Sequence, residues 1–303
     1  MCELSGVSRA GFYRQWQASA PRQADTALRD AVQQVAVEKR FYGYRRVQRE
    51  LRLRGHWVNA KRVLRLMRED NLLCLRTRRF VPATTDSQHG WRVWPNLARG
   101  LVTRNLNELW VADITYVRLR EEFVYVAVVL DAHSRRVIGW SLARHLGASG
   151  AVQALRMALA ERQPAPGLIH HSDRGIQYAC ADYLTLLTDH GAQPSMSRVG
   201  NPYDNAKAES FIKTLKQEQV HGRDWRDLDS LRAELTTFFE ITYNHQRLHS
   251  ALDYQTPAAF EQQLRSVANV KASTEMTGAR ELTAPSPQTP LPGLQSFSQE
   301  NCP

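Results

Sequence analysis

The sequence has few cysteines and no long apolar run. Cys2, Cys74, Cys180 and Cys302 are too far apart for a disulfide framework or a Cys-x-x-Cys metal site, and they are typical of a reducing, cytoplasmic setting. The longest apolar run, Phe123–Leu130, has eight residues, far short of the roughly 20 that cross a bilayer. We therefore expect a buried strand there and no membrane partner. The N-terminal residues contain no continuous apolar stretch, so no secretory signal is expected.

Lysine is also scarce, with six lysines against 34 arginines, and the basic excess is unevenly placed. The chain carries a formal charge of +10, but residues 1–109 carry +12 and the remaining 194 residues carry −2. Residues 40–79 alone hold 13 basic and 3 acidic side chains. Because guanidinium groups suit phosphate oxygens, this pattern favours a nucleic-acid-binding module joined to a nearly neutral part. The alternative is a solvated basic face without a ligand.

Two short helices joined by a tight turn are predicted inside the basic segment. Tyr44–Gly55 has helical spacing and ends in a C-cap glycine, and Asn59 can N-cap a second helix, Ala60–Glu69. This order is typical of a DNA-binding helix-turn-helix, and a basic hairpin with structural duties alone is the alternative. The residues expected to face inward from the second helix are Val63, Leu64 and Met67. Those expected to contact DNA are Arg45, Arg46, Lys61, Arg62, Arg65 and Arg68.

From Leu109 onward the pattern predicts a sheet flanked by helices. Three strands are expected over residues 109–119, 122–131 and 135–143, then a helix (149–162) with Ser149 as its N-cap, a strand (167–171), a helix (175–190) and a strand (193–197). Further helices are expected near Asn205 and over 228–243. This order predicts an α/β fold, a ribonuclease-H-like mixed five-stranded sheet flanked by helices and preceded by an all-α helix-turn-helix region.

The expected domain organisation follows from these patterns. A weak motif at Leu4–Tyr13 suggests the second half of another helix-turn-helix. The expected parts are a partial helix-turn-helix and helical linker (1–38), the basic helix-turn-helix (39–79), a connector (80–108), the ribonuclease-H-like domain (109–264) and a disordered Pro/Ser/Thr-rich tail (265–303).

Three carboxylates occupy informative places in the predicted sheet region. Asp113 interrupts the apolar first strand, where burial of a carboxylate is costly unless something positive meets it. Asp173 directly follows the fourth strand, at the kind of strand end where sites are built. Glu209 lies on a helix whose same face presents Lys213 and Lys216, with 35 residues between Asp173 and Glu209.

These residues suit phosphoryl transfer with paired metal ions. Mg²⁺ takes oxygen ligands, and two ions can hold the attacking and leaving oxygens of a displacement at phosphorus. Lys213 and Lys216 would then hold the flanking phosphates. Each acid also has a structural interpretation: Asp113 as an ion-paired strand residue, Asp173 as the N-cap of the next helix, and Glu209 as an exposed partner of Lys213.

Other acids and histidines are predicted to have structural roles. Asp131 is expected to be a turn residue, and Asp204 is expected to cap the helix of Glu209. The histidines do not present a complete set of zinc ligands, either in the pair His170 and His171 or in the pair His245 and His249.

Several stretches in order resemble one known family. The stretches are Tyr42–Arg46, Trp110–Tyr116, Val129–Arg135, His171–Tyr178, Asn201–Phe211, Tyr243–Ser250 and Thr256–Pro257. They resemble the integrase catalytic core of bacterial insertion-sequence transposases, and more closely the OrfB product of insertion sequence family three. The resemblance covers roughly residues 1–263.

The resemblance implies a DDE transposase in which Asp113, Asp173 and Glu209 hold Mg²⁺, two ions per site, with Mn²⁺ able to substitute. Such enzymes free a 3′-OH at the transposon end and join it to a second phosphodiester, without a covalent protein–DNA link and typically through a circular intermediate. The implied partners are terminal-repeat and target DNA, an upstream-frame OrfA product or fusion, and further copies of the chain on DNA, in a bacterial cytoplasm at the nucleoid.

Two other functions fit part of the pattern. A ribonuclease-H-like nuclease would only hydrolyse nucleic acid, and a DNA-binding regulator would keep the catalytic fold without its activity. The intact set of three acids and Lys216 argue against the regulator. Joined DNA products would separate the transposase from the nuclease.

Overall fold

The structure is a computed structural model that divides into two units. The first unit comprises residues 1–260 and contains every element named below. The second unit comprises residues 261–303, of which residues 261–267 are helical. The motif expected at Leu4–Tyr13 lies outside the described residues except for Ser8, as do residues 268–303 of the expected tail. Residues 92–108 of the expected connector contain neither helix nor strand. The described residues are 8, 25–74, 92–198, 202–221 and 223–267.

Five strands form one mixed sheet with the order β3-β2-β1-β4-β5. The pairs β1–β2 and β2–β3 are antiparallel, whereas β1–β4 and β4–β5 are parallel. The predicted ribonuclease-H-like sheet and its antiparallel three-strand start are therefore confirmed. The strands are β1 (Leu109–Arg118), β2 (Phe123–Asp131), β3 (Val137–Ala143), β4 (Ile169–Ser172) and β5 (Gln193–Met196).

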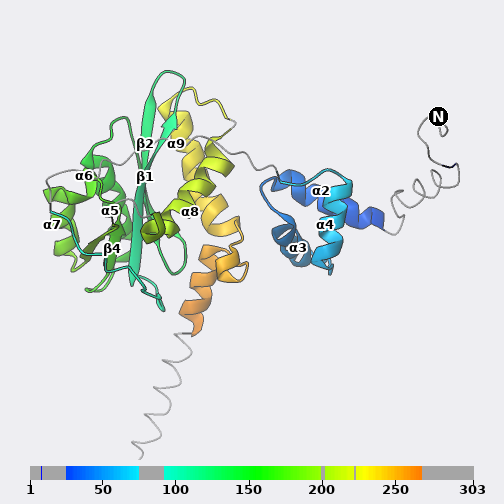
Figure 1. The fold of residues 1–303 in the computed structure, drawn as a ribbon, viewed down its shortest axis with the longest axis horizontal. Helices are drawn as coiled ribbons and strands as arrows, with labels where there is room; N and C mark the ends of the chain where they lie inside the picture. Colours follow the sequence, from blue (N-terminus) through cyan, green and yellow to red (C-terminus); the bar gives the residue numbers. More distant parts are fainter. Residues whose placement is uncertain (1–7, 9–24, 75–91, 199–201, 222, 268–303) are drawn as a thin grey trace, which may run out of the picture. The chain divides into compact units, whose positions relative to one another are not determined.

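Helices cover both faces of this sheet. Trp110 and Ala112 of β1 pack on the side of α5 (Ala148–Arg162) and α7 (Ala181–Asp189). Val111 and Val117 pack on the opposite side, against α8 (Ala206–Leu215) and α9 (Leu228–Thr237). Figure 1 shows the two groups of helices on either side of β1. A strand covered on both faces is apolar along nearly its whole length, and this is why Asp113 stands out in β1.

The helices around the sheet differ from the prediction in three places. The helix predicted over 175–190 is two helices, α6 (Ile176–Ala179) and α7, because Cys180 between them is extended. The N-cap residue of α5 is Gly147, so the predicted cap at Ser149 is wrong. Both α8 and α9 continue into wider π-helical turns, η3 (Lys216–Val220) and η4 (Phe238–Gln246). No helix in the described ranges is long and apolar enough to span a membrane.

Three helices in and just before the basic segment pack around one small core, to which Leu248 and Tyr254 also contribute. The helices are α2 (Thr26–Glu38), α3 (Tyr44–Leu53) and α4 (Ala60–Glu69). The predicted C-cap glycine is confirmed: Gly55 has a φ of 86°, and the next amide, His56 N, donates to Leu51 O at 2.8 Å, as in a Schellman motif. The predicted N-cap is also confirmed, because the Asn59 side chain accepts from Lys61 N at 2.8 Å.

The buried face of α4 differs from the prediction by one residue. Val63, Leu66 and Met67 are buried, whereas Leu64 is only half-buried. Residues 63, 66 and 67 share one helical face at the i, i+3, i+4 spacing, and this face packs on Val47 and Leu51 of α3 in the shared core.

Candidate active site

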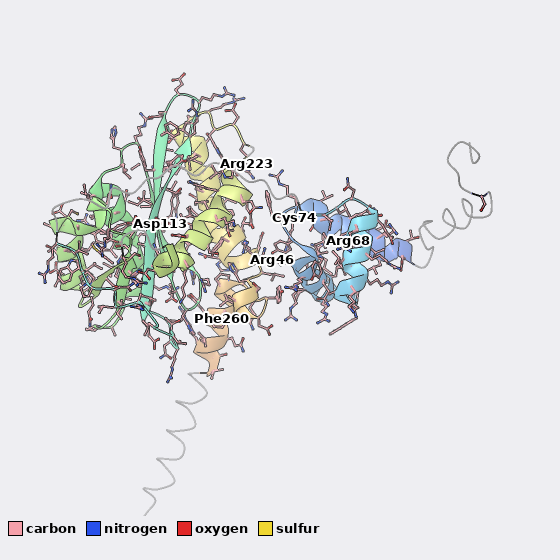
Figure 2. All side chains as sticks on the ribbon, viewed as in Figure 1. Arg46, Arg68, Cys74, Asp113, Arg223 and Phe260 are labelled. Atoms are coloured by element: carbon pink, nitrogen blue, oxygen red, sulfur yellow. The ribbon has the colours of Figure 1, made fainter. Side chains whose placement is uncertain are left out.

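Asp113 and Asp173 lie at the same level of two neighbouring parallel strands. β1 and β4 pair in the register Leu109↔Ile169 to Val111↔His171, so two further residues along each strand lead to Asp113 and Asp173. Neighbouring strands lie about 4.8 Å apart, and side chains two residues apart point to the same face. Asp113, in the middle of β1 (Figure 2), therefore points to the same face as Val111, which is the face covered by α8.

Asp173 also organises the turn that follows β4. Gly175 N donates to Asp173 Oδ1 at 3.0 Å, and α6 begins at the next residue, Ile176. The bond closes the turn before α6, but the N-cap residue of α6 is Gly175, so the alternative role of Asp173 as the N-cap is wrong. The same bond holds the carboxylate at the end of β4.

The helix α8 is attached to β1 directly beside Asp113. The Asn205 side chain, 5% exposed, donates from Nδ2 to Ala112 O at 3.1 Å. Ala208, Phe211 and Leu215 are buried along the face of α8 that packs on the sheet. Glu209, one turn after Asn205, is exposed on this helix. Because the Asn205–Ala112 bond joins residues 93 apart in the chain, no local spacing in the sequence reveals it.

Burial and crowding of negative charge raise the pKa of Asp113 from 3.8 to about 8. Burial is the largest cause, and the negative charges of Asp173 and then Glu209 add to it. The Ile114 amide, which donates to Asp113 Oδ1 at 2.8 Å, and the Lys216 ammonium act in the opposite direction. Asp173 and Glu209 are therefore close enough to Asp113 to raise its pKa, and the Ile114 amide and the Lys216 ammonium do not offset that rise.

The two predicted lysines have different surroundings. Lys216, at the junction of α8 and η3, is half-buried with Nζ 4.2 Å from the centroid of the Tyr116 ring. Burial lowers the pKa of Lys216, and the charge of Asp113 opposes that change. Lys213 is exposed. Lys216 is thus the lysine that interacts with Asp113.

A buried tyrosine hydroxyl, which sequence reasoning did not identify, lies behind the aspartates. Tyr178 is 3% exposed, and its hydroxyl has no hydrogen-bond partner. Burial raises its pKa well above the ordinary value, and Asp173 and Asp113 raise it further. The phenol therefore stays neutral beside the carboxylates. Tyr178 ends the stretch His171–Tyr178, but nothing in the sequence pattern shows that its side chain turns back toward Asp173.

The donor set suits a hard divalent cation. Carboxylate oxygens are the ligands that Mg²⁺ prefers, and a pKa of about 8 at Asp113 means that added positive charge would be favourable there. In the described conformation, no group of three or more His, Cys, Asp or Glu side chains is close enough to hold a metal ion. Asp113 and Asp173 are the residues whose register brings them together, and Glu209 approaches them from α8.

Structural roles were also predicted for Asp131 and Asp204, and only the first prediction is confirmed. Asp131 is a turn residue as predicted, since its Oδ1 accepts from His133 N and Ser134 N at 2.8 and 2.9 Å. The prediction that Asp204 caps α8 is wrong. The Asp204 carboxylate instead accepts from the Arg198 amide and guanidinium, and Asn205 is the N-cap residue of α8.

The two histidine pairs considered from the sequence are His170 with His171 and His245 with His249. Among the described residues, neither pair belongs to a group of three or more side chains that could hold a metal ion. His170 Nε2 lies 3.0 Å from the Tyr183 hydroxyl, and His171 contacts Ser195 and Ser197 through its two ring nitrogens. Burial lowers the pKa of His170 to about 3 and that of His171 to about 4, so both rings are neutral.

The arginines predicted to contact DNA fall into separate groups. Arg62 and Arg65 both pair with Asp25, which is only 3% exposed. Lys61 and Arg68 are exposed and form no ion pair within the described parts of the chain. Arg68 is labelled in Figure 2. Arg45 is exposed beside the Tyr44 ring, and Arg46 is half-buried.

Comparison with known proteins gives matches along most of the chain. Residues 104–202 and 190–257 match two family models described as "Integrase core domain", and residues 23–80 match a model described as "HTH-like domain". The "Insertion element IS600 uncharacterized 31 kDa protein" of Shigella sonnei is 38% identical over 272 residues, which are 88% of this chain and 100% of that protein. "Transposase InsF for insertion sequence IS3A" of Escherichia coli K12 is 36% identical over 267 residues, which are 86% of this chain and 92% of that protein.

Solved structures give more distant matches. A simian T-cell lymphotropic virus intasome in complex with the PP2A regulatory subunit B56 gamma matches at 17% identity and a TM-score of 0.43, covering 89% of this chain and 80% of that chain. The HTLV-2 integrase catalytic core domain in complex with magnesium matches at 16% identity and a TM-score of 0.39, and the match covers 51% of this chain and 95% of that chain.

Proposed function

The chain belongs to the transposase family of the IS3 insertion sequences, and on that premise we propose that Asp113, Asp173 and Glu209 carry its chemistry at phosphorus. As a transposase with an integrase core it is an enzyme that acts on DNA. The observation that supports the assignment most strongly is the raised pKa of Asp113, because Asp173 and Glu209 are the two acids that contribute to it. Perturbed carboxylates in one place are typical of a functional site.

Asp113 and Asp173 would hold Mg²⁺, or Mn²⁺ in its place, and Glu209 would complete a two-ion site. When bound, the metal supplies positive charge for the attacking and leaving oxygens and lowers the pKa of a water. Asp113 has to lose its proton for this binding. Since burial and its neighbours raise the pKa of Asp113 to about 8, binding at neutral pH releases that proton.

The reaction consists of two displacements at phosphorus. In the first, a water oxygen bonds to phosphorus at the transposon end, the P–O3′ bond breaks and the transposon keeps a free 3′-OH. In the second, that 3′ oxygen bonds to phosphorus in target DNA and the target P–O3′ bond breaks. Lys216, held beside Asp113, neutralises charge at the scissile phosphate, and exposed Lys213 holds a neighbouring phosphate.

DNA is held by the helix-turn-helix region as well. Lys61 and Arg68 are exposed on α4 and can meet phosphates directly, whereas Arg62 and Arg65 would first have to leave Asp25. Arg45 adds an exposed cation on α3. We expect several copies of the chain on terminal-repeat DNA together with the upstream-frame OrfA product, at the bacterial nucleoid.

The test is product analysis with labelled terminal-repeat DNA of the element, target DNA and Mg²⁺, with and without the upstream-frame product. We expect joined products from the full chain. Asp113→Asn, Asp173→Asn and Glu209→Gln should each abolish cleavage and joining while DNA binding stays within about twofold of the unmodified chain. Joining that persists in one variant removes that residue from the site. Cleavage without any joining, under all conditions, would identify a nuclease instead.

A further inference from the structure

A pocket of about 170 Å³ lies on the other flank of α8 from Glu209. Its lining includes Lys207 and Thr214 of α8. At 100° per residue, Glu209 and Lys216 lie about 180° to 200° around the helix from Lys207, whereas Thr214 lies within about 20° of it. The helix therefore separates this pocket from the carboxylates. Its volume equals that of about five or six liquid waters, at roughly 30 Å³ each, which is enough for one phosphate group.

Cations from four separate segments converge on this pocket. They are Arg46 of α3 (Figure 2), Arg135 of the turn after β2, Lys207 of α8 and Arg247 just after η4. Arg247 forms a bidentate pair with Glu218, with bonds of 2.8 to 3.2 Å. Arg46, Arg135 and Lys207 form no ion pair with any described residue.

One carboxylate, Asp131, lines the pocket and offsets these cations only in part. Asp131 is fully buried, and its two oxygens accept hydrogen bonds from the backbone amides of Asn107, His133 and Ser134. Burial lowers the pKa of Arg46, Arg135 and Lys207. Repulsion from Arg247 lowers the pKa of Arg46 further, and repulsion from Arg135 does the same for Lys207. The charge of Glu218 opposes the change at Arg46, and that of Asp131 opposes the change at Lys207, but the pKa of each cation stays lowered. The four cations thus face two carboxylates among the described residues, so the cluster keeps an excess of positive charge.

A buried histidine adds a polar atom without a partner. His249 also lines the pocket and is 8% exposed, and its Nε2 has no hydrogen-bond partner. Burial and the neighbouring arginines lower its pKa to about 3, so the ring is neutral. A neutral imidazole that carries its proton on Nε2 donates one hydrogen bond, and an oxygen acceptor in the pocket would satisfy it.

Arg135 is held in an unfavourable backbone conformation. Its φ is 64°, in the left-handed region that bulky side chains rarely adopt. Such conformations persist only where the surroundings impose them, and they cluster at functional sites. At the rim, Ser210, Ser250 and Ala251 are exposed, so the pocket is open to solvent.

From this convergence we propose that the pocket binds one backbone phosphate of DNA. Phosphate oxygens match the guanidinium donors and the unsatisfied imidazole nitrogen. DNA is favoured over a free anion because Arg46 comes from α3, the first helix of the region expected to lie on DNA. This part of the proposal rests on the proposed function. The contact would fix the position of DNA relative to the sheet from the side of α8 opposite to the carboxylates.

The test measures DNA binding by the full chain without divalent metal, so that no cleavage occurs. A fluorescent 30-base-pair duplex is titrated by anisotropy at several salt concentrations for the unmodified chain, Lys207→Gln and Arg135→Asn. Each lost phosphate contact reduces the slope of log K against log salt by about 0.9. We expect that reduction in both variants. Arg156→Gln, which removes an exposed cation of α5 on the opposite face of the sheet, should leave the slope unchanged.

Melting temperatures keep the result interpretable. Asn tolerates a positive φ better than Arg, so Arg135→Asn should melt at or above the temperature of the unmodified chain. Unchanged slopes in both folded variants would overturn the proposal. A second arm compares inorganic phosphate with chloride at equal ionic strength: phosphate that raises only the melting temperature of the unmodified chain, together with unchanged slopes, would identify a free-anion site and refute the DNA contact.

The outcome is independent of the assignment of the catalytic residues. Reduced slopes in Lys207→Gln and Arg135→Asn would support the pocket even if Asp113→Asn retained joining activity. Normal slopes would refute the pocket even if Asp113→Asn abolished joining.

Discussion

Asp113→Asn is expected to stabilise the metal-free protein against unfolding, by an amount that grows with pH. Burial, Asp173 and Glu209 raise the pKa of Asp113 from 3.8 to about 8 in the folded chain. A group with a raised pKa contributes stability below its unfolded pKa, and that contribution is lost as pH rises through the folded pKa. Asparagine has nearly the same shape and no charge, and its Oδ1 can still accept from the Ile114 amide. The variant therefore escapes this loss.

The size of the expected stabilisation follows from the rise in the pKa of Asp113. About four units, at about 1.4 kcal/mol per unit, set an upper limit of about 6 kcal/mol at pH 9. At pH 5, about one unit above the unfolded pKa, the corresponding loss is about 2 kcal/mol. The advantage of Asp113→Asn over the unmodified chain should thus be larger at pH 9 than at pH 5 by about 1 to 4 kcal/mol, the lower values reflecting screening by solvent at a half-buried group.

The assay is urea unfolding followed by circular dichroism at pH 5 and pH 9 in the presence of EDTA. Asp189→Asn, at an exposed position at the end of α7, serves as the matched control and should show no such trend. An advantage of Asp113→Asn that is equal at the two pH values, or smaller at pH 9, would refute the uncompensated charge on which the catalytic assignment rests.

Four further variants test packing, DNA contacts and the ion pairs of Asp25. Gly139→Ala should destabilise the fold by about 1 to 3 kcal/mol, because its Cβ would fall on the Ala154 carbonyl oxygen and 2.9 Å from Ala158 Cβ. In Gly150→Ala, inside α5, the new Cβ meets no atom closer than 3.5 Å, and the variant should stabilise the fold by up to about 1 kcal/mol. Equal changes in the free energy of unfolding for Gly139→Ala and Gly150→Ala, measured in urea, would contradict this packing. Lys61→Gln with Arg68→Gln should reduce the salt slope of DNA binding by about 1.8 at an unchanged melting temperature. Arg62→Gln with Arg65→Gln should cost about 1 to 3 kcal/mol of stability, because it removes two cations that pair with the buried Asp25 carboxylate. An unaltered slope in the Lys61 and Arg68 double variant would remove α4 from the DNA interface.

The local features of the sheet region could be predicted because they depend on periodicity. β1 is apolar on both faces and β2 is an apolar run, so their positions follow from the sequence to within one residue. The helix ends at Gly55 and Asn59 also follow from local capping chemistry. Asp113 could be identified for the same reason, since a carboxylate is conspicuous in an apolar strand.

Long-range features could not be predicted in the same way. The register that puts Asp173 level with Asp113 depends on strand pairing over 60 residues, and the pairing of Arg62 with Asp25 depends on how α2 meets α4. Cys180 breaks a helix without a proline or glycine at that position, because the chain turns there between α6 and α7. The cationic pocket likewise draws on segments that are separate in the sequence.

The most direct test of the central claim is joining of a pre-cleaved terminal-repeat end to target DNA in Mg²⁺. The end carries either a 3′-OH or a 3′-deoxy terminus, and the full chain is compared with Asp113→Asn and Asp189→Asn. The account predicts joined product from the 3′-OH end with the unmodified chain and with Asp189→Asn, and none from the deoxy end or from Asp113→Asn. Joined product at an unreduced rate from Asp113→Asn would contradict it.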